Sequence, residues 1–140
     1  MKQTRLNIVT KTEKYPIIIG SNLNSSISKI FKSNSIDFDK CLIVVDKNVP
    51  KKFVSNIKKS LKNKSIFVLF FNASEKNKNI NSVNKILEVL LNKNFSRNDV
   101  LISLGGGITG DVSGFAASLF KRGLKLSLIH ISEPTRRDQI

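Results

Sequence analysis

Short, mainly apolar runs alternate along the chain with segments whose apolar residues recur every three or four positions. The runs cover residues 41–45, 66–71 and 100–104, a length and composition typical of strands buried on both faces of a parallel sheet. Helical spacing follows the first two runs, in Phe53, Val54, Ile57 and Leu61 and then in Ile80, Val83, Ile86, Leu87, Leu90 and Leu91. With a small-residue helix at 110–120, the order β-α-β-α-β-α predicts an α/β fold: a Rossmann-like parallel sheet with helices on both faces.

The start of the chain has a different pattern. Residues 6–10 and 15–19 predict two short strands around the polar turn 11–14. Ser21 and Asn22 are suited to capping a helix with Leu23, Ile27, Ile30 and Phe31 on one face. Pro50 is expected in the first turn of the helix that follows the strand 41–45.

Composition limits the class of protein. The chain has 140 residues, enough for one domain with its own core, and its mean hydropathy of −0.10 is ordinary for a globular protein. Its longest apolar run, 66–71, is too short to cross a bilayer, so no membrane partner is expected. The single cysteine, Cys41, lies in an apolar run and offers no disulfide framework, which favours a reducing, cytoplasmic location.

The charge adds one alternative. Lys and Arg number 24 against 10 Asp and Glu, a formal net charge of +14, and such a balance suits a polyanion such as nucleic acid. The lysines are scattered among Asn and Ile, and the base-stacking aromatics are scarce, with no Trp and one Tyr. We therefore expect a solvated basic surface and no nucleic-acid partner, with a basic nucleic-acid-binding module as the distant alternative.

A glycine-rich stretch follows the third strand. Residues 105–110 read G-x-G-x-x-G, and glycine N–H groups at the carboxyl end of a parallel strand can approach a pyrophosphate beside a helix N-terminus. The ordinary dinucleotide fingerprint instead follows the first strand of its unit, with an acidic residue about 20 positions later. A ligand-free glycine turn is therefore a competing interpretation, as are Asp46 as a turn residue and Glu75 and Lys78 as solvated loop charges.

If the stretch does bind a dinucleotide, each candidate has a distinct task. Asp46 would accept hydrogen bonds from ribose hydroxyls, Glu75 and Lys78 would contact the adenosine side, and Asp111 would bind the nicotinamide side or order the loop. The helix expected to open near Gly110 would add its positive end. The full candidate set is Asp46, Glu75, Lys78, Gly105, Gly106, Gly107, Ile108, Thr109, Gly110 and Asp111.

The string LGGGITGDVSGFAASLFKRG, residues 104–123, resembles the segment LGGG-x-x-GD-x-x-GF-A-A-x-x-x-x-RG of 3-dehydroquinate synthases. YPIIIG at 15–20 and the strand that ends in Asp46 match the family in order and spacing. The family's loop P-D-G-E-x-x-K reads N-A-S-E-K-N-K at 72–78, so Glu75 and Lys78 match while Pro, Asp and Gly do not. The resemblance covers roughly residues 5–125.

The resemblance implies an N-terminal NAD-binding α/β domain of the dehydroquinate synthase-like superfamily. The whole enzyme, a lyase of the shikimate pathway, converts the sugar phosphate 3-deoxy-D-arabino-heptulosonate 7-phosphate to 3-dehydroquinate and phosphate. Its NAD is returned unchanged, and a divalent metal, zinc or cobalt, is held by a C-terminal helical domain. The resemblance is compatible with a homodimer for the whole enzyme. A related NAD- and metal-dependent polyol dehydrogenase is the alternative.

The end of the chain departs from that family. LSLIHISEPTR, at 126–136, is similar to a translated transposon-end adapter of sequencing libraries. We therefore expect an incomplete NAD-binding domain at 1–125 and a non-native tail at 126–140, without the metal-binding domain. On this interpretation the chain has no catalytic residue and no metal ligand, His130 has no role, and the chain alone is inactive.

Overall fold

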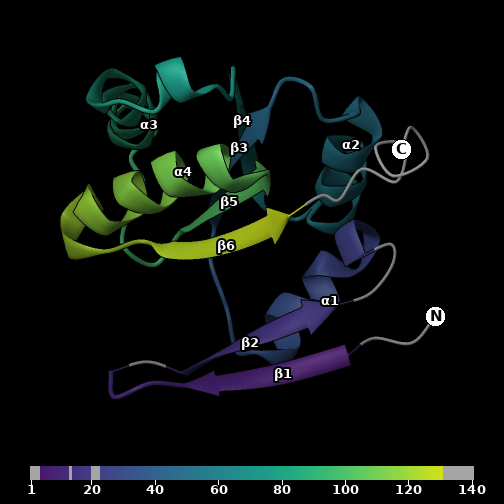
Figure 1. The fold of residues 1–140 in the computed structure, drawn as a ribbon. Helices are drawn as coiled ribbons and strands as arrows, with labels where there is room; N and C mark the ends of the chain where they lie inside the picture. Colours follow the sequence, from purple (N-terminus) through teal and green to yellow (C-terminus); the bar gives the residue numbers. More distant parts are fainter. Residues whose placement is uncertain (1–3, 13, 20–22, 131–140) are drawn as a thin grey trace, which may run out of the picture.

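The structure is a computed structural model that describes residues 4–12, 14–19 and 23–130. Its core is a four-stranded parallel sheet in the order β4-β3-β5-β6, and an antiparallel hairpin of β1 and β2 lies apart from it (Figure 1). The strands are β1 Thr4–Val9, β2 Lys14–Ile19, β3 Lys40–Asp46, β4 Ser65–Phe71, β5 Val100–Gly105 and β6 Lys125–His130. The helices are α1 Ile27–Ser33, α2 Lys51–Ser60, α3 Ile80–Asn92 and α4 Gly107–Leu119, with 3-10 turns at Leu23–Ser26, Glu75–Asn77 and Phe120–Arg122.

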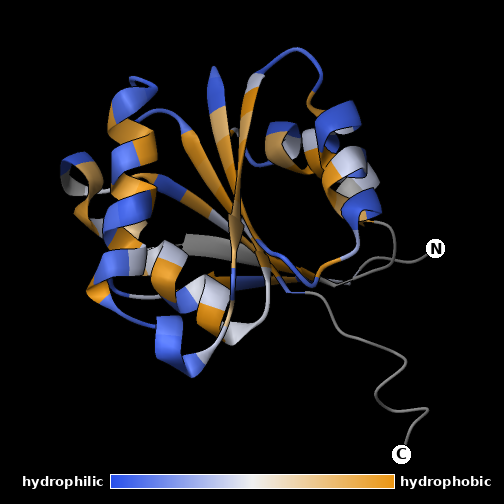
Figure 2. Cartoon of the chain, turned by 90° about the horizontal axis from the view of Figure 1, so that it is seen from above, coloured by the Kyte–Doolittle hydropathy of each residue, from blue (hydrophilic) through white to orange (hydrophobic). Residues whose placement is uncertain are grey.

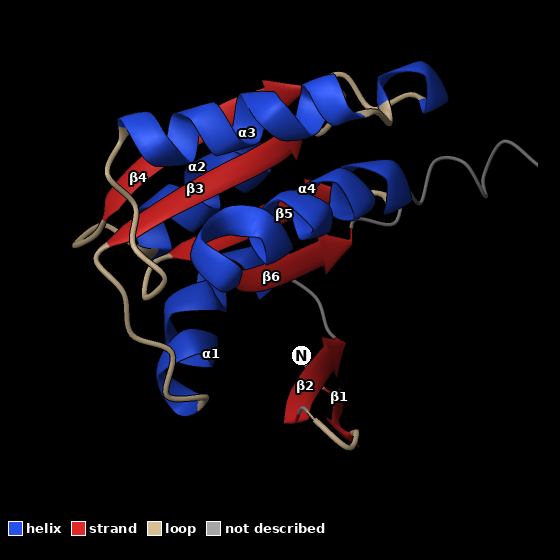
Figure 3. Cartoon of the chain, turned by 90° about the vertical axis from the view of Figure 1, so that its left-hand side faces the viewer, coloured by secondary structure: helices blue, strands red, loops and turns tan. Residues whose placement is uncertain are grey.

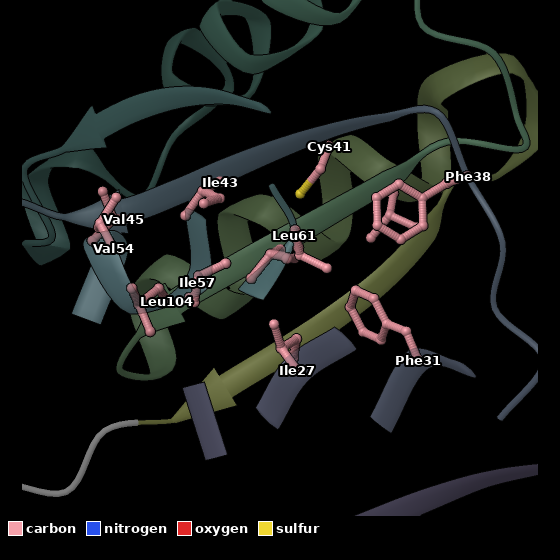
Figure 4. Close-up of a cluster of buried hydrophobic side chains, with 12 residues drawn as sticks. Ile27, Phe31, Phe38, Cys41, Ile43, Val45, Val54, Ile57, Leu61 and Leu104 are labelled. Carbon is pink, nitrogen blue, oxygen red and sulfur yellow. The ribbon is translucent and has the colours of Figure 1, made fainter. Parts of the chain in front are cut away.

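Helices cover both faces of the sheet, as the alternation of apolar runs and amphipathic segments predicts (Figure 2). On central strand β3, Ile43 and Val45 pack with α1 and α2, a cluster that Figure 4 shows in close-up. Leu42 and Val44 pack instead in the cluster of α3 and α4. Because successive side chains of a strand point to opposite faces, an uninterrupted apolar run is what such a central strand requires.

Strand β4 corrects one prediction. The apolar run 66–71 predicts burial on both faces, yet β4 is an edge strand whose residues are mostly half-buried, and the side chain of Phe70 is 58% exposed. An apolar run reveals the strand but does not show whether a neighbour covers its outer edge.

Two helix starts also differ from prediction. Helix α4 begins at Gly107 and not near Gly110, because Gly106 is its N-cap and the N–H of Gly110 already bonds the carbonyl of Gly106. Pro50 is the N-cap of α2, one position before the first turn. The predicted capping residues Ser21 and Asn22 lie outside the described residues, and the chain continues from a 3-10 turn at Leu23–Ser26 into α1.

Strand β6 is an element that the sequence pattern does not predict. It pairs in parallel with β5, with Lys125 opposite Val100 and His130 opposite Gly105. Its Leu126 and Leu128 lie under α4, where a Cβ added at Gly114 or Gly110 would stand 3.6 or 3.5 Å from their methyl groups. Residues 126–130 thus complete a β-α-β unit, while the foreign origin expected for 126–140 remains a prediction.

Candidate functional site

The carboxyl ends of β3 and β5 bring two predicted site residues together. Asp46 ends β3 and Gly105 ends the neighbouring β5, so both lie at the edge where α/β folds bind ligands. Gly105 has a φ of +151°, and a Cβ there would stand 3.1 Å from the Cβ of Asp46 and 3.1 Å from the Oγ1 of Thr109. Only glycine fits this backbone and lets Asp46 approach the turn so closely.

The next two glycines differ, because they face open space. Gly106 is the N-cap of α4 and Gly107 its first residue; both are exposed, and an added Cβ would meet nothing within 4 Å. The first intrahelical bond at this end runs from the N–H of Gly110 to the carbonyl of Gly106, at 3.1 Å. The preceding N–H groups have no carbonyl within the helix to bond, and with the helix dipole they make this end, beside Asp46, suited to an anion.

Asp46 also shapes its own turn. Its Oδ1 accepts the N–H of Asn48 at 3.2 Å, and its carbonyl accepts the N–H of Val49 at 2.9 Å. The interpretation of Asp46 as a turn residue is thus correct for one carboxylate oxygen. Within the described ranges, Oδ2 has no hydrogen-bond partner, so it is available to a hydroxyl.

The loop before α3 meets α4 through an ion pair. Lys78 Nζ lies 3.1 Å from Asp111 Oδ2, with side chains 46% and 61% exposed. The hydrogen bond and the charge of Asp111, and then the charge of Glu75, raise the pKa of Lys78, so its ammonium stays charged at neutral pH. The pair borders a groove of about 270 Å³, lined by Lys78, Asn79, Ile80, Val83, Asp111, Val112 and Phe115.

The remaining predicted residues of the glycine turn are partly or fully buried. Thr109 is fully buried and its Oγ1 has no partner among the described residues, so only its backbone faces the helix end. Ile108 is half-buried, and Gly110 packs over Leu128. Ser113, one turn further along α4, has a second buried hydroxyl without a described partner.

One buried carboxylate was missed by the sequence reasoning. Asp99 is 5% exposed and lies at the opposite edge of the sheet, before β5. It accepts the N–H groups of Asp39, Lys40 and Ser96 at 3.2, 2.9 and 2.9 Å, and the Ser96 hydroxyl at 3.3 Å. Burial opposes its charge, but these hydrogen bonds outweigh burial and lower its pKa. The spacing Ser96-x-x-Asp99 in a turn was the available signal, and its role is to stabilise the fold.

A metal centre does not form in the described part of the chain. Among residues 4–12, 14–19 and 23–130, no group of three or more His, Cys, Asp or Glu lies close enough to hold an ion. His130 is exposed at the carboxyl edge, beside Gly105 in the β5–β6 pairing, and belongs to no such group among the described residues. No helix in the described part of the chain is long and apolar enough to cross a membrane.

The chain is similar in sequence to known proteins. A family model described as 3-dehydroquinate synthase N-terminal matches residues 68–135. A 3-dehydroquinate synthase of Pelagibacter ubique is 59% identical over 121 residues, which cover 86% of this chain and 33% of that protein. One of Blochmanniella floridana is 35% identical over 125 residues, covering 86% of this chain and 34% of that protein. The chain thus spans about a third of the length of these relatives.

Solved structures give the same fold. A 2-deoxy-scyllo-inosose synthase complexed with carbaglucose-6-phosphate, NAD⁺ and Co²⁺ superposes with a TM-score of 0.78 at 25% identity, covering 91% of this chain and 34% of its own. A 1,3-propanediol oxidoreductase superposes less well, with a TM-score of 0.53 at 25% identity over 71% of this chain and 25% of its own. The family match, the identity to curated synthases and the shared fold together show that this chain is similar to the N-terminal third of 3-dehydroquinate synthases.

Proposed function

We propose that this chain supplies the NAD-binding part of a 3-dehydroquinate synthase. The observation that carries the proposal is the exposed N-terminus of α4, where Gly106 and Gly107 leave open space beside Asp46. The whole enzyme would convert 3-deoxy-D-arabino-heptulosonate 7-phosphate to 3-dehydroquinate and phosphate, in the cytoplasm. The free, buried Cys41 accords with that location.

The residues present fit a dinucleotide. The N–H groups at Gly106 and Gly107 would donate to the pyrophosphate, whose charge the helix end attracts. The unpartnered Oδ2 of Asp46 would accept from a ribose hydroxyl, and the charged Lys78 with Glu75 would contact the adenosine side. Bound NAD supplies a reversible hydride acceptor for the substrate carbinol.

The residues present do not fit the divalent metal, because the described part of the chain brings no set of ligands together. We propose that this chain alone does not turn over, since the metal-holding half of the reaction centre would have to come from other residues. The polyol dehydrogenase alternative has weaker support, because the oxidoreductase neighbour matches a smaller share of the chain at a lower TM-score than the inosose synthase.

Calorimetric titration of the chain with NAD tests the proposal, with Asp46→Ala and Gly107→Val as site variants. Position 107 suits the test because a side chain there meets only open space, so valine would obstruct the ligand and leave the fold intact. Asn84→Ala, an exposed change in the second turn of α3 at a residue that does not line the groove, is the control. We expect both site variants to weaken binding and the control to match the unmodified chain. Equal binding by all four proteins would refute the site.

Titration with duplex DNA distinguishes the proposed NAD-binding function from the nucleic-acid-binding alternative. A salt-dependent shift of DNA mobility by a chain that binds no NAD would favour the basic module over the synthase.

A further inference from the structure

The loop between β4 and α3 is closed by side chains and not by a tight glycine turn. The Nδ2 of Asn77 donates to the carbonyl of Asn72 at 2.9 Å, across the whole width of the loop. The N–H groups of Asn77 and Lys78 continue the closure, donating to the carbonyls of Ser74 and Glu75. Asn77 therefore connects the end of β4 with the last turn before Lys78.

Asn77 is held from its other side by α3. The hydroxyl of Ser82 donates to the carbonyl of Asn77 at 2.6 Å. The N–H of Ser82 donates to Oδ1 of Asn79, the N-cap of α3, at 3.0 Å. The Nδ2 of Asn79 donates to the carbonyl of Lys76 at 2.9 Å. Residue 77 is thus fixed between a strand end and a helix start, both parts of the packed fold.

Lys78 follows Asn77 directly, and its ammonium reaches across to α4. Its partner Asp111 lies on the second turn of α4, behind the open glycines. A lysine side chain has several rotatable bonds, and an exposed ion pair alone stabilises little. The direction of the Lys78 side chain therefore depends on how firmly the backbone of residues 77 and 78 is held.

We propose that Asn77 is a positioning residue, which holds Lys78 opposite Asp111 and so joins the β4–α3 loop to the first turns of α4. Its consequence for the cofactor rests on the function proposed above, because Lys78 and Asp111 are both proposed NAD contacts. Asn77 itself acts through Lys78 and does not touch the ligand.

The test measures the pair directly and then the binding. Trace acetylation of the chain, followed by mass spectrometry, gives the reactivity of Lys78 relative to exposed Lys62. Asp111→Asn removes the charge that pairs with Lys78 and so gives the reference reactivity of an unpaired Lys78. Asn77→Ala removes the hydrogen bond from the Asn77 side chain to the carbonyl of Asn72. Ser82→Ala removes the hydrogen bond from the Ser82 hydroxyl to the carbonyl of Asn77, so the test does not depend on the folding of one variant. Asn84→Ala is the matched control on the same helix.

We expect Asn77→Ala and Ser82→Ala each to raise Lys78 reactivity toward that of Asp111→Asn, with Lys62 and the control unchanged. The NAD dissociation constant should rise by about fivefold in both, the change that one neutral hydrogen bond gives. Unchanged Lys78 reactivity in both variants, or in Asp111→Asn itself, would overturn the proposal, as would altered reactivity with unaltered NAD affinity. If the unmodified chain binds no NAD, the proposed function fails, and the acetylation result alone decides the role of Asn77.

Discussion

Replacing Asp99 by asparagine should destabilise the fold well beyond the effect of a surface mutation. The carboxylate is 5% exposed, and each of its oxygens accepts two hydrogen bonds: Oδ1 from the N–H groups of Asp39 and Lys40, and Oδ2 from the N–H and hydroxyl of Ser96. Asparagine keeps the shape but replaces one oxygen by an NH₂ group. That group would face the Ser96 N–H, donor against donor.

The expected loss of unfolding free energy can be estimated from these hydrogen bonds. A hydrogen bond to a charged group contributes about 1.5–3 kcal/mol, and a donor left buried without a partner costs a comparable amount, so we expect about 3 kcal/mol for Asp99→Asn. Urea unfolding followed by circular dichroism measures it as a midpoint lowered by about 1.5 M at an ordinary slope of about 2 kcal/mol/M. Asp37→Asn is the control, because its side chain is 97% exposed, pairs with Lys64 at 3.5 Å and accepts a single backbone hydrogen bond, from the N–H of Phe38 at 3.0 Å. It should cost under about 0.5 kcal/mol.

The pH dependence gives an independent check. The folded-state pKa of Asp99 is lowered, so its ionised form adds stability that is present above the unfolded-state pKa of about 4 and is lost as pH falls through the lower folded-state pKa. The stability advantage of the unmodified chain over Asp99→Asn should therefore shrink below about pH 4. An Asn variant as stable as the Asp37→Asn control at pH 7 would refute the reasoning.

Two further outcomes follow from particular positions. Gly105→Ala should lower the free energy of unfolding by about 1–3 kcal/mol, because alanine is strained at a φ of +151° and its Cβ would crowd Asp46. Gly106→Ala should be nearly neutral, because a Cβ there meets nothing within 4 Å. Thermal unfolding compares the two variants, and equal midpoints would contradict the steric argument. Burial, and then the charge of Asp99, raise the pKa of Cys41 to about 12, so the thiol should react with a disulfide reagent only on unfolding, and rapid labelling of the native chain would contradict its burial.

Much of the fold was predictable from the sequence, because the core is built from uninterrupted apolar strands. The run 41–45 has apolar side chains on both faces, and helices cover both of them. The similar run at 66–71 forms the edge strand β4, and its sequence does not indicate which strands pair with it. The glycines indicate a loop up to Gly110, but helix α4 begins at Gly107, and its Gly110 and Gly114 pack closely on the sheet.

The candidate site was predictable in part. Asp46 and the glycines meet because strand ends in a parallel sheet share an edge, which the apolar pattern already indicates. The pairing of Lys78 with Asp111 depends on how the β4–α3 loop folds over α4, and no local pattern specifies that. Buried hydroxyls such as those of Thr109 and Ser113 gave no signal, because Ser and Thr are more often exposed than buried.

The packing of α4 on the sheet would preorganise the proposed site. Figure 3 shows α4 lying along β5 and β6, with its first turn above the strand ends. Gly110 and Gly114 admit Leu128 and Leu126 at van der Waals distance, and Gly105 brings Asp46 against the turn. An anion arriving at Gly106 and Gly107 would meet N–H groups whose orientation the packed sheet has already fixed. Little conformational entropy is then lost on binding, so a few hydrogen bonds suffice for useful affinity.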